Sequence, residues 1–178
     1  MKYFLNLKKS MTYLGLHPKT IFIGQAVAYK GTAMTNTLAE IKKKKLLELP
    51  VAEEMQMGMT LGLALNGYIP ISVFPRWNFI MCGMNQLVNH IDKISLMSKN
   101  QFKTKMIIRT SIGSKRPLHP HCQHIGDFTF AIQKMCPNLD IIRLDNPNII
   151  FSSYKKALHR KDGKSTILVE YGDYYNEK

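Results

Sequence analysis

The sequence predicts an α/β fold, a three-layer sandwich in which a mostly parallel β-sheet is covered by helices on both faces. Strand-like and helix-like segments alternate along the chain. The strand-like segments are nearly continuous apolar runs, which is typical of parallel strands buried on both faces. The 178 residues contain no internal repeat and no long linker. We therefore expect one domain over residues 1–178, with residues 1–19 as an N-terminal helix and lead-in.

Six short segments rich in β-branched and aromatic residues are predicted to be strands. The first ends at Gly24, and the second is stopped by Pro50. The predicted strands are 20–25, 45–50, 69–74, 105–110, 139–144 and 165–170.

Apolar residues recur at helical spacing between these strands. In segment 51–66, Met55, Met59 and Leu63 fall on one face, and Gly67 follows where a glycine commonly caps a helix. A loop rich in Gly, Pro and His is predicted over 113–126. The predicted helices are 3–13, 51–66, 79–97, 127–135 and 148–159.

The net charge of +13 and the pI of about 9.7 make nucleic acid or a membrane surface the first partners to consider. The one basic block, four lysines at 42–45, precedes a predicted strand, where such a run is most often a solvated helix end. Aromatic residues are not interleaved with the lysines as single-strand binding would need. Nucleic-acid binding therefore stays a weakly supported alternative.

The cysteines and the N-terminus indicate a reducing compartment. Cys82, Cys122 and Cys136 form no Cys-x-x-Cys pair. The first apolar stretch stops at Lys8, which is too short for a secretory signal, and no apolar run is long enough to span a membrane. We therefore expect a cytoplasmic protein without a membrane partner.

Common catalytic motifs are absent from the sequence. It contains no GxGxxG, GxxxxGK[ST], HExxH or GxSxG motif. No set of His, Cys, Asp and Glu residues has metal-ligand spacing, so we expect no metal site in this chain. The sequence therefore gives no support to four classes of protein: Rossmann, P-loop, zinc-protease and α/β-hydrolase.

The informative residues follow the predicted strands, where open α/β sheets bind ligands. Glu53 lies at a strand-to-helix junction, in a first helical turn that stabilises an anion. Without further evidence, Glu53 would be interpreted as an ordinary acidic residue in the first turn of a core helix. It is accompanied by an ordered set of motifs: Pro50 to Glu53; Gly58, Gly62, Gly67 and Pro70; Phe74, Trp77 and Phe79; Gln86, Asn89 and Lys93; His121, Cys122 and Gln123; and Cys136 to Leu139.

This set resembles the pyrimidine-binding domain of thiamine-diphosphate enzymes in the transketolase-like group. It is most similar to the beta subunit of 2-oxo-acid dehydrogenase decarboxylating components, from about residue 20 to residue 172. The resemblance implies the same α/β fold, thiamine diphosphate as cofactor, and transferase or oxidoreductase chemistry on a small 2-oxo acid or ketose.

The resemblance also implies a role for each matched position. Glu53 matches the glutamate that hydrogen-bonds N1′ of the aminopyrimidine, so that the exocyclic nitrogen can remove the thiazolium C2 proton. Phe79 matches the aromatic residue that packs on the pyrimidine face, and Trp77 and Pro75 belong to the same cofactor-binding segment. His121 matches an active-site histidine that exchanges protons with substrate-derived groups.

The chain departs from the family pattern in ways that bear on the substrate more than on the cofactor. Glu54 adjoins Glu53, although the spacing to the later glycines favours Glu53. Unusual residues precede the aromatic pair, and the histidine loop carries two further histidines and a cysteine in place of serine: Pro75, Arg76, His119, His124 and Cys122. Whether Glu54 shares the role of Glu53 is left open.

Two parts of the family are missing from this sequence. It has no Gly-Asp-Gly with a downstream Asn, the pattern that holds Mg²⁺ and diphosphate, and it stops before a third domain. We therefore expect a diphosphate-binding subunit of the alpha type to supply these, in a hetero-oligomer around a homodimer, with Gly58 and Gly62 packed closely against a partner. The alternatives are a non-catalytic assembly or regulatory module of the same fold, and a basic nucleic-acid-binding domain.

Overall fold

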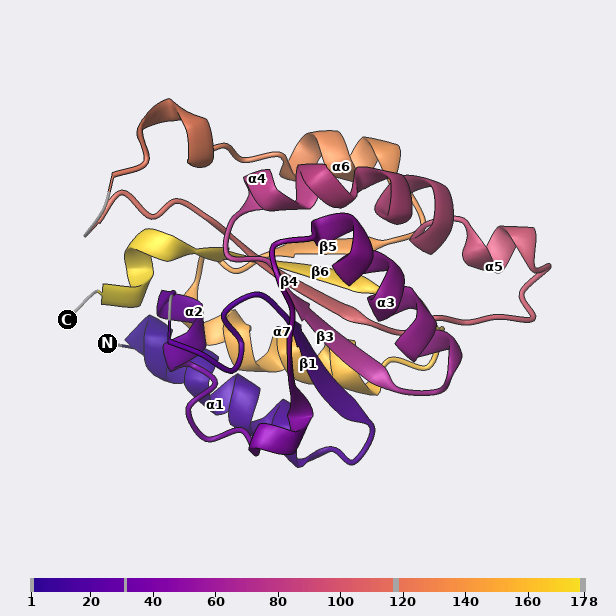
Figure 1. The fold of residues 1–178 in the computed structure, drawn as a ribbon, viewed down its shortest axis with the longest axis horizontal. Coiled ribbons are helices and arrows are strands. Elements are labelled where there is room, and N and C mark those ends of the chain that lie inside the picture. The colour runs from indigo at the N-terminus through magenta and orange to yellow at the C-terminus, as the bar shows by residue number, and fades with distance from the viewer. Residues whose placement is uncertain (1, 31, 117–118, 177–178) are drawn as a thin grey trace.

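The computed structural model describes residues 2–30, 32–116 and 119–176 and contains a six-stranded, all-parallel sheet (Figure 1). This confirms the predicted α/β sandwich. The strands lie in the order β2-β1-β3-β4-β6-β5, so β3 and β4 take the two central places. Their bounds are β1 (Thr20–Gly24), β2 (Leu46–Glu48), β3 (Ile69–Val73), β4 (Ile107–Ile112), β5 (Asp140–Arg143) and β6 (Thr166–Tyr171).

Helices cover both faces of the sheet (Figure 1). One face carries two long helices and a short one, which enclose an apolar cluster that includes Leu7 and Phe22. The other face carries three helices over a cluster that includes Met57 and Ile108. The first group is α1 (Lys2–Leu16), α2 (Ala33–Asn36) and α7 (Pro147–His159), and the second is α3 (Glu53–Leu65), α4 (Trp77–Ile80) and α6 (Thr129–Met135).

The prediction of one continuous helix over 79–97 is wrong. The segment is broken into α4, a 3₁₀ turn η2 (Met81–Gly83), a π-helical stretch η3 (Gln86–Ile91) and α5 (Ile94–Met97). The break follows from packing. A Cβ on Gly83 would lie 3.1 Å from the carbonyl oxygen of Glu53, so the segment presses against the start of α3. Within the π-helical stretch the backbone N–H of Asp92 donates to the carbonyl oxygen of Leu87, and Leu87 and Ile91 are both buried.

The basic block differs from its prediction as a solvated helix end. Residues 43–45 form a short 3₁₀ turn, η1 (Lys43–Lys45), directly before β2. Lys45 is half-buried, and its ammonium donates to the carbonyl oxygens of His17 and Thr20. Burial lowers the pKa of Lys45, and the neighbouring lysines lower it further. Lys45 is therefore part of the fold, whereas the other lysines of the block are exposed.

A fully buried ion pair joins β4 to β6. Arg109 Nε lies 2.5 Å from Glu170 Oε1, and Arg109 Nη2 lies 3.0 Å from Glu170 Oε2. The hydroxyls of Tyr154 and Tyr175 donate to the same carboxylate, and Arg109 Nη1 donates to Thr37 Oγ1. Burial alone would lower the pKa of Arg109, but Glu170 and the two tyrosines raise it well above its ordinary value. The network satisfies two buried charges with five side chains.

The beginning and the end of the described chain are held together by Tyr3 on α1. Its hydroxyl donates to the carbonyl oxygen of Leu144 at 2.7 Å and accepts from the backbone N–H of Tyr171 at 2.9 Å. Its ring packs edge-on against Tyr174, with centroids 5.4 Å apart. Residues far apart in sequence thus complete one side of the core.

The cysteines of the structure are free thiols. Cys82 and Cys122 are exposed, whereas Cys136 is buried, and this burial raises the pKa of Cys136 to about 11. None of the described helices is long and apolar enough to cross a membrane.

Candidate active site

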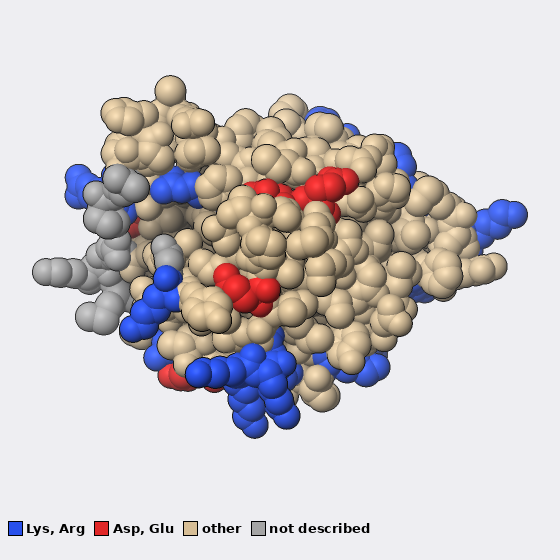
Figure 2. Space-filling model, in the orientation of Figure 1, with Lys and Arg blue, Asp and Glu red and all other residues tan. Residues whose placement is uncertain are grey.

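Glu53 is the first residue of α3 and lies in an open depression of about 650 Å³. The depression is bordered by Met55, Met59, Cys82 and Gln86. The Glu53 side chain is half-buried and forms no hydrogen bond or ion pair with the residues that the structure describes. Figure 2 shows acidic side chains at the start of α3, within a largely uncharged surface. The carboxyl group of Glu53 is therefore available to a ligand.

Glu54, the neighbouring carboxylate, is already engaged. Its Oε1 accepts from Asn85 Nδ2 at 2.9 Å and from Gln86 Nε2 at 3.0 Å. The hydrogen bond from Asn85, followed by that from Gln86, lowers the pKa of Glu54. Glu54 ties α3 to the segment after α4, which leaves Glu53 as the unengaged acid of the pair.

The start of α3 is held against the sheet by the buried side chain of Gln56. Its Nε2 donates to Ser72 Oγ and to the carbonyl oxygen of Val73, both at 3.0 Å. This contact requires glycine at position 24, where φ is +151° and a Cβ would lie 2.5 Å from the Val73 oxygen. The position of Glu53 is thus set by the ends of β1 and β3.

The three predicted cofactor-binding residues of the segment after β3 lie in different surroundings. Phe79 is half-buried, and its ring lies 5.3 Å from the ring of His124. Trp77 is 1% exposed within the core, so its ring presents no free face. Pro75 is half-buried and lines a second cavity. The segment therefore offers Phe79, not Trp77, to a ligand.

His121 stands apart from these residues in the structure. It is exposed at the start of a 3₁₀ turn, η4 (His121–His124), with φ +52°. Its ring packs against the ring of His119, with centroids 5.5 Å apart. No described contact joins His121 to Glu53 or Phe79. The histidine that touches the aromatic residue is His124.

Arg76 fixes the histidine loop and was not assigned a role from the sequence. Its Nη1 donates to the carbonyl oxygens of Gly113, Ser114 and His124 at 3.0, 3.3 and 3.0 Å. Asn78 Nδ2 also donates to the carbonyl oxygen of Gln123 at 2.8 Å. In the sequence, the only indication of this role was that a basic residue stands directly before the aromatic residues Trp77 and Phe79.

Metal-binding groups do not gather at this edge. Over residues 2–30, 32–116 and 119–176, no three His, Cys, Asp or Glu side chains are arranged to hold a metal ion.

Sequence comparison gives a match over nearly the whole chain. A family model described as "Transketolase, pyrimidine binding domain" matches residues 11–176. The chain is 29% identical over 135 residues to the pyruvate dehydrogenase E1 component subunit beta of Gracilaria tenuistipitata var. liui, covering 75% of this chain and 40% of that protein. It is 27% identical over 165 residues to the chloroplastic subunit beta-3 of Oryza sativa subsp. japonica, covering 90% and 41%. The chain spans less than half the length of these relatives.

Solved structures share the fold at low sequence identity. A split-gene transketolase, described as an inactive beta4 tetramer, superposes with a TM-score of 0.72 at 17% identity, covering 94% of this chain and 50% of that chain. A transketolase from Campylobacter jejuni subsp. jejuni superposes with a TM-score of 0.71 at 13% identity, covering 92% and 25%.

Proposed function

Because this chain belongs to the family of transketolase pyrimidine-binding domains, we propose that it is the pyrimidine-binding subunit of a two-subunit thiamine-diphosphate enzyme. Its substrate would be a small 2-oxo acid or a ketose. The observation that carries this proposal is the unengaged carboxyl group of Glu53, held at the start of α3 beside an open depression.

The described residues fit the pyrimidine half of the cofactor. When bound, thiamine diphosphate supplies an acidic carbon and an electron sink for carbonyl chemistry. Glu53 would hold a proton at N1′ of the aminopyrimidine, and the first turn of α3 stabilises its anionic form between transfers. Phe79 would pack on one ring face, and it is itself packed against the buried cluster of this face of the sheet. His121 would exchange protons with the substrate.

The cation and the diphosphate are assigned to a partner subunit of the alpha type, because the described residues offer no cation cluster. The surface around Glu53 suits such a partner. Exposed apolar residues lie just before α3, on α3 and on η2: Val51, Met55, Met59 and Met81 are 66, 43, 37 and 42% exposed. The matched relatives carry the name subunit beta, and the split-gene neighbour is described as inactive in its beta4 form. We propose a hetero-oligomer around a homodimer.

Reconstitution tests this function. The chain would be co-expressed with the protein encoded beside it, provided that this protein carries Gly-Asp-Gly and a downstream Asn. The complex should bind thiamine diphosphate only with Mg²⁺, turn over a 2-oxo acid or ketose, and protect the exposed Cys82 from alkylation. Assembly without cofactor dependence would favour the non-catalytic module instead. Salt-sensitive binding to DNA without any partner would favour the nucleic-acid alternative.

Gly62 provides a test of the proposed interface. No heavy atom lies within 4 Å of the position that its Cβ would take, so Gly62→Leu should leave the isolated chain folded. A leucine there would stand out from α3 and should weaken partner binding at least tenfold, measured by calorimetry. The control is Gly62→Ala, which should stabilise the isolated chain by about 0.4–1 kcal/mol and still bind. Equal partner affinity for the leucine variant would show that α3 is not the interface.

A further inference from the structure

The helices α1 and α7 carry lysines but no acidic residue. Figure 2 shows basic side chains gathered at the lower edge of the molecule, on the side where α1 lies in Figure 1. The exposed lysines 42–44 stand at the end of α1, where the neighbouring Lys45 donates to the carbonyl oxygen of His17. Part of the positive charge of the sequence is therefore concentrated around these helices. The exposed lysines of the two helices are Lys2, Lys9, Lys155 and Lys156.

Exposed apolar side chains lie among these lysines. Leu5 and Leu16 on α1 are 53 and 77% exposed. Leu16 follows Leu5 by eleven positions, about three helical turns or ~16 Å, so both side chains leave the same side of α1. A depression of about 430 Å³ runs along this side and is bordered by Lys9, Tyr13 and Phe151, of which the two aromatic residues are half-buried. We call these residues, together with the exposed lysines of the two helices, the α1–α7 surface.

The chain itself neutralises little of the charge on this surface. Lys8 lies at its border, and its ammonium is 2.8 Å from Glu40 Oε1. The Lys9 ammonium lies over the ring of Phe151, 4.7 Å from the centroid. The exposed lysines of α1 and α7 have no carboxylate within 4.0 Å among the described residues. Their charges are therefore available to an acidic partner.

The contacts of the surface favour an acidic protein segment over other occupants. A second copy of this chain would bring a net charge of +13 against the same charge. Single-stranded nucleic acid needs open aromatic faces, but Lys9 covers a face of Phe151, and the Tyr13 ring meets Phe151 edge-on with centroids 5.3 Å apart. A bilayer takes up apolar side chains that insert into it, whereas Tyr13 and Phe151 are half-buried within a depression.

We propose that the α1–α7 surface binds an acidic amphipathic helix of a partner protein. The apolar side chains of that helix pack over Leu5, Leu16 and the depression between them, and its carboxylates lie beside Lys9, Lys155 and Lys156. The distance along α1 from Leu5 to Leu16 suits a helix of at least three turns lying parallel or antiparallel to α1.

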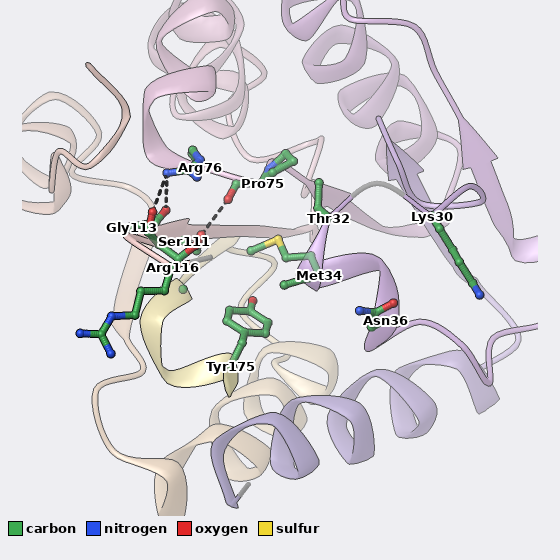
Figure 3. Close-up of a pocket in the computed structure, with 13 residues that line it drawn as sticks. Lys30, Thr32, Met34, Asn36, Pro75, Arg76, Ser111, Gly113, Arg116 and Tyr175 are labelled. Carbon is green, nitrogen blue, oxygen red and sulfur yellow. Dashed lines mark hydrogen bonds between the residues drawn. The ribbon is translucent and has the colours of Figure 1, made fainter. Parts of the chain in front are cut away.

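The α1–α7 surface faces away from the residues discussed for catalysis. α1 and α7 cover one face of the sheet, and α3 covers the other (Figure 1). On the inner side of α1, Tyr3 packs against Tyr175, with ring centroids 6.2 Å apart, and Tyr175 lines the cavity drawn in Figure 3. The outer side of α1 therefore points away from that cavity. A helix bound there leaves Glu53 accessible, so the proposal does not depend on the proposed enzyme.

A synthetic peptide tests the surface. It would have about 18 residues, with leucines along one face, glutamates elsewhere, a side-chain staple to hold it helical and a fluorophore. Its fluorescence anisotropy should show saturable, one-to-one binding to the full chain. A control peptide of the same composition and staple, with leucines spread over all faces, should bind about tenfold more weakly. No saturable binding, or equal binding of the two peptides, would overturn the proposal.

Variants locate the peptide on the chain. Leu5→Ser and Leu16→Ser should each weaken binding about threefold to tenfold, because each removes an exposed apolar contact without disturbing the core. The double variant Lys155→Gln with Lys156→Gln should weaken binding about threefold, since charges at a rim contribute modestly. The matched control is Leu96→Ser on α5, which changes a leucine that is 62% exposed and should leave the affinity unchanged. Unchanged affinity in both leucine variants of α1, or an equal loss in the control, would refute the assignment.

Two further probes distinguish the occupant. Vesicles of phosphatidylcholine and phosphatidylserine in equal amounts, and a DNA duplex, should each bind the chain more weakly than the amphipathic peptide does. Half-saturation by either of them at a lower concentration than by the peptide would contradict the proposal and assign the surface to a membrane or to nucleic acid. Glu53→Gln should bind the peptide normally, so failure here and failure of the proposed enzyme are distinguishable.

Discussion

Replacement of Glu53 by glutamine should lower the turnover of the reconstituted enzyme by about 10²–10⁴-fold, the range that a positioned acid–base group contributes. Glutamine has nearly the same shape, so α3 and the partner interface should be unchanged. It can still contact N1′, but it cannot hold and release a proton there. The measurement is kcat at saturating thiamine diphosphate, with complex formation followed separately.

Glu54→Gln is the matched control for this prediction. The residue is adjacent and has the same chemistry, but its carboxylate is bound by Asn85 and Gln86. Turnover should stay within about threefold, because the glutamine oxygen can still accept from at least one of these amides. A larger loss at Glu54 than at Glu53 would reverse the assignment of the two acids.

Replacement of Glu170 by glutamine should lower the free energy of unfolding by about 3–5 kcal/mol, because it leaves the Arg109 charge buried without a counter-ion. Arg109 and Glu170 are both 0% exposed, so water cannot replace the lost carboxylate. The loss is a large part of the stability of a typical domain. Urea unfolding of the isolated chain measures it without any partner.

The exposed pair of Lys8 and Glu40 supplies the control. Its charges are 2.8 Å apart but 34 and 53% exposed, so Glu40→Gln should leave the denaturation midpoint unchanged. A double variant, Arg109→Met with Glu170→Leu, should recover part of the stability, because it removes both charges together. Destabilisation no greater than that of Glu40→Gln would show that the buried pair is not structurally important.

The sequence was sufficient to predict the positions of the strands, but not to predict how the side chains are arranged around the site. The run 69–74 became β3 within one residue, because a parallel strand buried on both faces is apolar along nearly its whole length. The helix expected over 79–97 failed, since apolar spacing does not report that Gly83 packs on the Glu53 carbonyl. Helical periodicity is a local signal, and the break has a tertiary cause.

The aromatic pair and the histidine loop show the same limit. Trp77 and Phe79 stand two positions apart, and only the packing of α4 decides that the first is buried in the core and the second is left accessible. Three histidines lie in one loop. His124 is the one whose ring contacts Phe79, and its carbonyl oxygen accepts a hydrogen bond from Arg76. A motif predicts which residue types are near a site, whereas their orientation is set by long-range contacts.

The Tyr3 hydroxyl has a consequence for the order of events during synthesis. It bonds to Leu144 and Tyr171, which the ribosome makes about 140 and 168 residues after it. Strand β6 also lies between β4 and β5, so the sheet cannot close before residues 166–171 have emerged. The packing of α1 therefore cannot be completed until residues 144–171 of this chain have been made. During that interval the apolar face of α1 would be exposed to aggregation.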